Sequence, residues 1–247
     1  MATSRVRDLE ARVERFAAAL ERAAGDNLAS LVLYGSAAAG AAREDSDVNL
    51  LLVLRDAGAA SLRPLGNAVR EWVREGERPP LIFSERSWRA AADVFPLEIE
   101  DIRARHRVLR GRDPVADIAT APDDGRRELE REARGRLVQL RAAYAAAESD
   151  GKALSDLTAQ ACKALVPLFR ATLRLAGRTP ADTAGAVVGE VAALAGLEAA
   201  AFDWPLARLA GTAAPDLAPY DARAARFLDA ASAFVDYVDR VSPRETT

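Results

Sequence analysis

The sequence contains very little cysteine, histidine and lysine, and each shortage limits what the chain can do. Cys162 is the only cysteine, so neither an internal disulfide nor a multi-cysteine metal site can form. It sits in an apolar stretch and is interpreted as a small buried hydrophobic residue. His106 is the only histidine and stands between arginines, which is more typical of a surface or interface residue than of a catalyst.

Strong charge of either sign and long apolar runs are also absent. The net charge of -3 provides no electrostatic attraction to nucleic acid or to an anionic membrane, so we expect neither as a partner. No apolar run approaches the roughly 20 residues that span a bilayer. The N-terminal stretch is charged and amphipathic, unlike a signal peptide. These features predict a cytoplasmic protein, and they leave its oligomeric state open.

Short apolar runs and helical patterns alternate in the first half of the chain. Apolar residues recur at three- and four-residue steps in two segments, whereas β-type runs are short and bounded by Gly, Ser or Pro. The patterns predict helices over 3–24, 61–76 and 85–94, the last capped by Ser84, and strands over 31–34, 48–54 and 81–83. Residues 97–102 alternate at a period of about two, and 107–111 fit either a last strand or a turn.

The second half of the chain carries only helical patterns. Four segments show helical spacing, marked by residues 129–144, 154–173, 182–195 and 227–238. Helices of this length predict a bundle. The fold class expected is therefore α+β, with a small mixed-sheet α/β domain over 1–113 and an all-α helical bundle domain over 124–247.

One segment of the first half contains the candidate functional residues. The apolar run 31–34 ends at Gly35-Ser36, and ten residues later Asp47-Val48-Asn49 opens the second apolar run. This arrangement resembles the signature of nucleotidyltransferases of the DNA polymerase β superfamily, in which Gly-Ser precedes an Asp-x-Asp or Asp-x-Glu pair. The helical second half resembles the arrangement of aminoglycoside nucleotidyltransferases, where such a bundle contacts the acceptor.

The resemblance implies roles for these residues. Gly35 and Ser36 would hold a nucleoside triphosphate, because a glycine lets backbone N–H groups approach phosphate closely. Asp47 and Asn49 would hold Mg²⁺, or Mn²⁺ in its place, since residues i and i+2 of a strand share a face and hard cations prefer oxygen ligands. Arg43, in the intervening loop, is a candidate phosphate contact.

The sequence departs from the family pattern at two positions. Asn49 stands where the family has a second acid, so the site lacks one negative charge. The family's third carboxylate, which activates the acceptor hydroxyl, should lie on the strand 81–83, and this strand contains no acid. Glu98 is the candidate replacement, with Glu100 and Asp101 as alternatives; on a period of two, Glu98 and Glu100 share a face.

Several other features admit an ordinary interpretation. The arginines between 103 and 112 fit a solvated strand edge better than a triphosphate site. The three tryptophans are far apart in sequence and are interpreted as core or interface anchors rather than as a stacking platform. Asp47 itself has a structural alternative, in which it merely caps a turn.

Two functional hypotheses follow. The first is a metal-dependent nucleotidyltransferase that moves a nucleoside monophosphate from a nucleoside triphosphate to a hydroxyl of a small molecule or a protein, with Asp47 and Glu98 as catalytic residues. The second is a degenerate scaffold of the same fold that binds a nucleotide or a protein partner without turnover. The acceptor and the preferred base stay open.

Overall fold

The chain divides into two compact units, 1–121 and 122–247, each with its own core. The structure is a computed structural model that describes residues 2–35, 37, 38, 48–212 and 214–241, with side chains described from residue 8 onward. No helix within these residues is long and apolar enough to cross a membrane.

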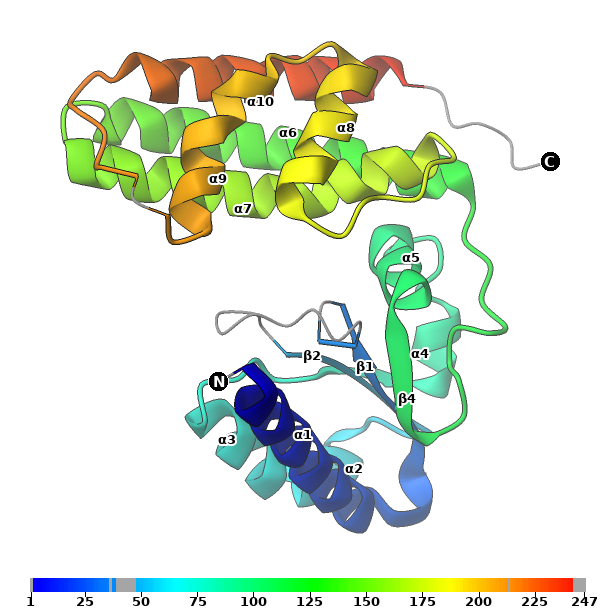
Figure 1. Cartoon of the computed structure of the whole chain (residues 1–247). Helices are drawn as coiled ribbons and strands as arrows, with labels where there is room; N and C mark the ends of the chain where they lie inside the picture. The colour runs from blue at the N-terminus through cyan, green and yellow to red at the C-terminus, as the bar shows by residue number, and fades with distance from the viewer. Residues whose placement is uncertain (1, 36, 39–47, 213, 242–247) are drawn as a thin grey trace. The chain divides into compact units, whose positions relative to one another are not determined.

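A four-stranded mixed sheet forms the centre of the first unit (Figure 1). The strands are β1 (Leu28–Tyr34), β2 (Asn49–Leu54), β3 (Leu81–Ser84) and β4 (His106–Gly111), in the order β3-β2-β1-β4. β1 is antiparallel to both β2 and β4, whereas β2 and β3 are parallel. The predicted mixed sheet is confirmed, and residues 107–111 belong to a strand.

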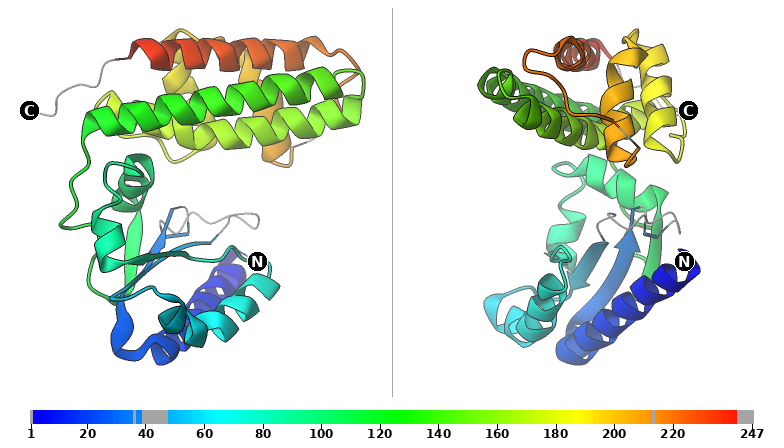
Figure 2. Two further views of the ribbon diagram at one scale, coloured as in Figure 1. Left: turned by 180° about the vertical axis from the view of Figure 1, so that it is seen from behind. Right: turned by 60° about the vertical axis from the view of Figure 1, so that its left-hand side comes forward.

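Helices cover both faces of this sheet (Figure 2). Leu31 and Leu33 of β1 point to the face covered by α1 (Ala2–Ala24) and α3 (Gly66–Arg74). Val32 and Tyr34 point to the opposite face, covered by α4 (Glu85–Arg89) and α5 (Pro96–Ala104). This alternation is the period of two that a strand imposes, and it explains why both faces of β1 carry apolar residues.

The predicted helix over 61–76 is divided in three. α2 (Ala59–Leu62) passes into a 3₁₀ turn, η2 (Arg63–Leu65), before α3 begins. Pro64 in that turn lacks the N–H that a continuous helix needs, which explains the break. Trp72 of α3 stacks on Phe16 of α1 with ring centroids 4.5 Å apart, whereas the neighbouring Val73 is 45% exposed.

Two expectations about residues 84–104 need correction. α4 ends at Arg89 rather than at 94, although Ser84 does cap it, with the Ser87 hydroxyl completing the capping box in place of Glu or Gln. The alternation predicted over 97–102 is wrong, because these residues form the helix α5. Its buried residues, Pro96, Ile99 and Ile102, follow each other at helical three-residue steps, and a proline suits the first turn of a helix.

The second unit is entirely helical in its described residues (Figures 1 and 2). Its helices are α6 (Pro122–Ala147), α7 (Gly151–Leu175), α8 (Ala184–Ala195), α9 (Asp203–Leu209) and α10 (Ala222–Arg240), with a 3₁₀ turn η3 (Ala199–Phe202) before α9. The four predicted helices are confirmed. η3 and α9 were not predicted, because they are too short to display a period. Phe202 of η3 nevertheless belongs to the aromatic core: its ring centroid lies 5.6 Å from that of Phe169 and 5.5 Å from that of Phe227.

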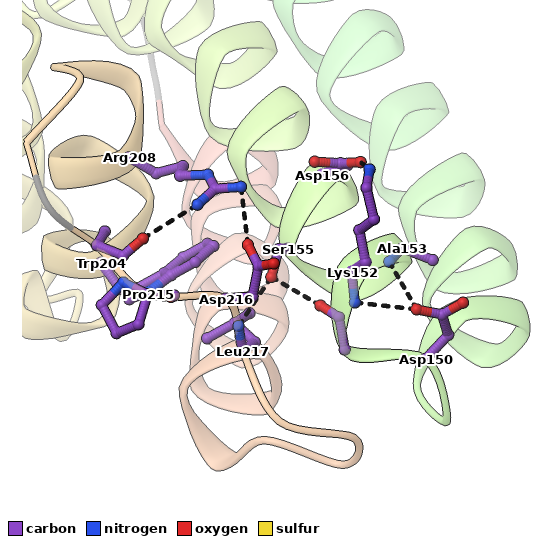
Figure 3. Close-up of polar contacts among 12 residues, drawn as sticks. Asp150, Lys152, Ala153, Ser155, Asp156, Trp204, Arg208, Pro215, Asp216 and Leu217 are labelled. Carbon is purple, nitrogen blue, oxygen red and sulfur yellow. Dashed lines mark hydrogen bonds and ion pairs between the residues drawn. The ribbon is translucent and has the colours of Figure 1, made fainter.

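An irregular segment before α10 is held against the start of α7 by polar contacts (Figure 3). The Ser155 hydroxyl donates to the carbonyl of Gly151 and accepts the N–H of Leu217 at 2.8 Å. The indole of Trp204 donates to the carbonyl of Pro215, and Arg208 forms an ion pair with Asp216 at 2.8 Å. These contacts satisfy backbone groups that no regular element pairs.

The close approach of β4 to β1 generates a stability prediction. Gly111 has φ +74, and a Cβ there would lie 2.1 Å from the carbonyl oxygen of Ala29. Gly76, in the same unit, has φ +90 but no atom within 4 Å of such a Cβ. We expect Gly76→Ala to cost about 1–2 kcal/mol from the left-handed backbone alone. Gly111→Ala should cost a further ~1–3 kcal/mol from overpacking, measured by urea unfolding. Equal losses for the two variants would contradict the clash.

Candidate active site

Three polar residues lie in one row across the end of the sheet. Tyr34 of β1 is paired in register with Asn49 of β2 on one side and with His106 of β4 on the other. Directly paired residues of antiparallel strands point to the same face. Because Tyr34 belongs to the core cluster beneath α4 and α5, this row lies on the face that those helices cover.

The turn after β1 brings the backbone close to Asn49. Gly35 adopts φ +76, which favours glycine, and its N–H donates to the carbonyl of Arg105 at 2.9 Å. A Cβ at position 35 would lie 3.2 Å from Nδ2 of Asn49. The absence of a side chain at Gly35 therefore keeps the space beside the Asn49 amide open.

The partly buried carboxyl of Glu98 reaches the same strand end. Glu98 lies in the first turn of α5, and the Tyr34 hydroxyl donates to its Oε1 at 2.7 Å. Burial raises the pKa of Glu98 above its ordinary value; the hydrogen bond from Tyr34 lowers this pKa, and the negative charge of Asp101 raises it. Burial and the neighbouring Glu98 likewise raise the pKa of the Tyr34 phenol. The Glu98 carboxyl therefore holds a proton more readily than an exposed carboxyl does.

Glu98 and Glu100 do not share a face. On a helix, residues two apart point in different directions, and Glu100 instead contacts Arg103 and the hydroxyl of Thr120. Of the acids considered as replacements for the missing strand carboxylate, Glu98 is the one that the structure joins to β1 through a hydrogen bond. β3 itself supplies only Leu81, Ile82, Phe83 and Ser84.

Tyr34 is not among the site residues predicted from the sequence. Its hydroxyl group was the available signal, because a phenol at the end of a mostly apolar strand needs a polar partner when it is buried. That partner comes from α5, whose helical nature the alternation in the sequence concealed.

The remaining predicted site residues Ser36, Arg43 and Asp47 lie outside the described residues, and their roles stay predictions. Among the described residues, no three or more His, Cys, Asp or Glu side chains gather in a way that could hold a metal ion. The oxygen donor that β2 offers in the described part is the amide of Asn49.

His106 and the arginines around it have ordinary partners. His106 Nε2 lies 3.1 Å from Oδ2 of Asp113. Arg110 forms ion pairs with Glu14 and Glu21 of α1, and Arg112 forms one with Glu85. β4 is an edge strand, so these pairs favour the interpretation of a solvated strand edge over that of a triphosphate site.

The fold of this chain is similar to that of a solved structure, whereas its sequence matches no family model and no curated protein sequence. The solved structure of the spectinomycin adenyltransferase AAD(9) from Enterococcus faecialis, with ATP and spectinomycin, covers 94% of this chain and 99% of its own, with a TM-score of 0.60 and 10% sequence identity. The fold is similar to that of this adenyltransferase. At this identity the comparison concerns the fold alone, and it confirms both the fold class and the resemblance inferred from the Gly35–Asn49 segment.

The partly buried carboxyl of Glu98 predicts a stability that depends on pH. Because the pKa of Glu98 is raised in the folded state, its contribution to stability is fully present below its unfolded pKa of about 4.3 and is lost as the pH rises through the folded value. Glu98→Gln removes this titration. We expect the free energy of unfolding of the wild type, minus that of the variant, to fall as the pH rises from about 4.

Urea unfolding over this pH range measures that difference. The matched control is Glu75→Gln, at an exposed glutamate of the same unit, since surface substitutions usually change stability by no more than about 0.5 kcal/mol. A difference for Glu98→Gln that stays constant with pH would show that Glu98 has no raised pKa.

Proposed function

We propose that this protein transfers a nucleoside monophosphate from a nucleoside triphosphate to a hydroxyl of a small molecule and releases pyrophosphate. The observation that carries the proposal is the Glu98 carboxyl, held 2.7 Å from the Tyr34 hydroxyl at the strand end where Gly35 and Asn49 meet. The match over 94% of the chain to a fold used for adenylyl transfer supports it.

Residues of the Gly35–Asn49 segment bind the donor in this proposal. Gly35, Ser36 and Arg43 contact the triphosphate, and Asp47 and Asn49 hold Mg²⁺. The donor set suits this ion, because carboxylate and amide oxygens are hard ligands and Gly35 leaves space beside the Asn49 amide. When bound, the ion neutralises charge on the triphosphate and on the departing pyrophosphate.

Glu98 is the general base. It takes the proton of the acceptor hydroxyl while the hydroxyl oxygen forms a bond to the α-phosphorus and the bond from that phosphorus to the bridging oxygen breaks, with pyrophosphate leaving. A general base works best when its pKa approaches the working pH, and burial shifts the pKa of Glu98 in that direction.

The acceptor class is proposed as a polyhydroxylated small molecule. AAD(9), whose fold is similar, is a spectinomycin adenyltransferase solved with that compound, which makes spectinomycin the first acceptor to test here. Nucleic acid is not proposed as a partner, because the net charge of -3 offers no attraction to a polyanion.

Nucleotide binding gives the first test of the proposal. A ligand that binds only the native state raises the melting temperature, by about 5–10 °C at 100 times its dissociation constant for a chain of this size. We expect such an increase with at least one of the four nucleoside triphosphates in the presence of Mg²⁺, and we expect Asp47→Ala to abolish it.

The control for this test is Asp93→Ala, at an exposed acid of the same unit, which should keep the full increase. Retention of the Mg²⁺-dependent increase in Asp47→Ala would contradict the metal site, and its absence in the wild type with every nucleotide would contradict nucleotide binding altogether.

A second candidate function is nucleotide binding without turnover. The observation in its favour is the charge of the site: Asn49 supplies a neutral amide, and β3 supplies no acid. Both functions predict nucleotide binding, so only a measurement of turnover separates them.

Asn49→Asp tests the role of position 49. An added carboxylate beside Asp47 should bind Mg²⁺ more tightly, so we expect a lower Mg²⁺ concentration at half-maximal thermal shift, by about tenfold for each 1.4 kcal/mol gained. Pyrophosphate release with spectinomycin in the wild type supports transfer. If both the wild type and Asn49→Asp bind nucleotide but neither releases pyrophosphate, binding without turnover is favoured. An unchanged Mg²⁺ requirement in Asn49→Asp would show that position 49 does not face the ion.

A further inference from the structure

We propose that Tyr34 is a positioning residue for Glu98: its hydroxyl fixes one carboxylate oxygen and leaves the other to take the proton of the acceptor hydroxyl. This inference rests on the proposed function, and it adds to the site a residue that the nucleotidyltransferase signature does not contain. It begins from one contact, the 2.7 Å hydrogen bond from the Tyr34 hydroxyl to Glu98 Oε1.

The backbone around Tyr34 leaves this side chain little freedom. Tyr34 is 7% exposed and is paired through β1 with strands on both sides. Its ring lies in the same core cluster as Ile99 and Ile102 of α5, the residues that fix that helix on the sheet. A phenol held in this way presents its hydroxyl at one place, whereas a solvated partner would not.

The hydrogen bond from Tyr34 goes to one of the two carboxyl oxygens of Glu98. Oε1 accepts the Tyr34 hydroxyl at 2.7 Å, and in this proposal Oε2 takes the proton. Rotation about the carboxyl bond is therefore limited by a single fixed contact, which is what a base needs in order to meet an acceptor hydroxyl in one orientation.

Within the part of the chain that the structure describes, charged and titratable groups approach the pair from three directions. Asp101, one turn further along α5, raises the pKa of both groups, and Arg78, just before β3, lowers that of Tyr34. On the β4 side, His106 is paired in register with Tyr34 and contacts Asp113. The contact that a change at Tyr34 removes is therefore the hydrogen bond from its hydroxyl to Oε1 of Glu98.

Tyr34→Phe isolates the hydroxyl because it keeps the ring in the core. The hydrogen bond favours the charged form of Glu98, so its loss should raise the pKa of that carboxyl. Titration of the full-length protein by NMR, with ¹³C-labelled glutamate side chains and Glu98→Gln to assign the signal, measures this shift without any need for turnover. We expect a Glu98 titration at higher pH in Tyr34→Phe.

The activity measurement uses the same variants. Pyrophosphate release with spectinomycin should show a lower kcat in Tyr34→Phe with little change in KM for the nucleotide, and the acidic limb of its kcat–pH profile should move to higher pH. The control is Tyr220→Phe, at a tyrosine that is 67% exposed in the second unit, which should change neither the Glu98 titration nor the profile.

The outcomes separate the two proposals. A Glu98 titration in Tyr34→Phe that matches the wild type overturns the positioning role, whatever the activity. Full activity in Glu98→Gln overturns the base assignment in the proposed function, and the positioning role with it. A shifted titration together with a shifted profile and an inactive Glu98→Gln supports both.

Discussion

The pairing of β1 with strands on both sides is the constraint on which the rest of the first unit depends. Hydrogen bonds to β2 and β4 fix its register, and the period of two then assigns every side chain to a face. Leu31 and Leu33 pack against α1 and α3 on one face, while Val32 and Tyr34 pack against α4 and α5 on the other. A slip of one residue would exchange these faces and remove the candidate site along with the core.

The candidate site is a consequence of where that register ends. β1 stops at Tyr34, and the glycine that follows turns the chain beside Asn49 through a backbone conformation that favours glycine. The same last position directs a phenol beneath α5, where it meets Glu98. The region that would hold a donor nucleotide and the carboxyl that would activate an acceptor thus meet at one strand end.

The position of Glu98 explains how a strand without an acid is compatible with the proposed chemistry. A carboxylate on β3 would depend on the sheet alone for its orientation, whereas Glu98 depends on α5 and on Tyr34 together. Its burial makes the carboxyl hold a proton more readily, and the Tyr34 hydroxyl opposes that effect. Burial has the larger effect of the two, so the pKa of Glu98 is raised overall.

Much of the fold was available from the sequence, because it is expressed as local periodicity. The first three strands, α1 and the four long helices of the second unit all carry patterns of apolar residues that one element can show by itself, whereas residues 107–111 fitted either a strand or a turn. The spacing from Gly35 to Asn49 was sufficient to indicate a fold similar to that of AAD(9). The short elements were lost or misjudged for the same reason: η3 and α9 are too short to show a period, and six residues at 97–102 fit an alternation as well as a helix. What only the tertiary structure decided is the contact between Tyr34 and Glu98, 64 residues apart, because the direction of a side chain depends on the helix or strand that carries it and its partner is set by packing.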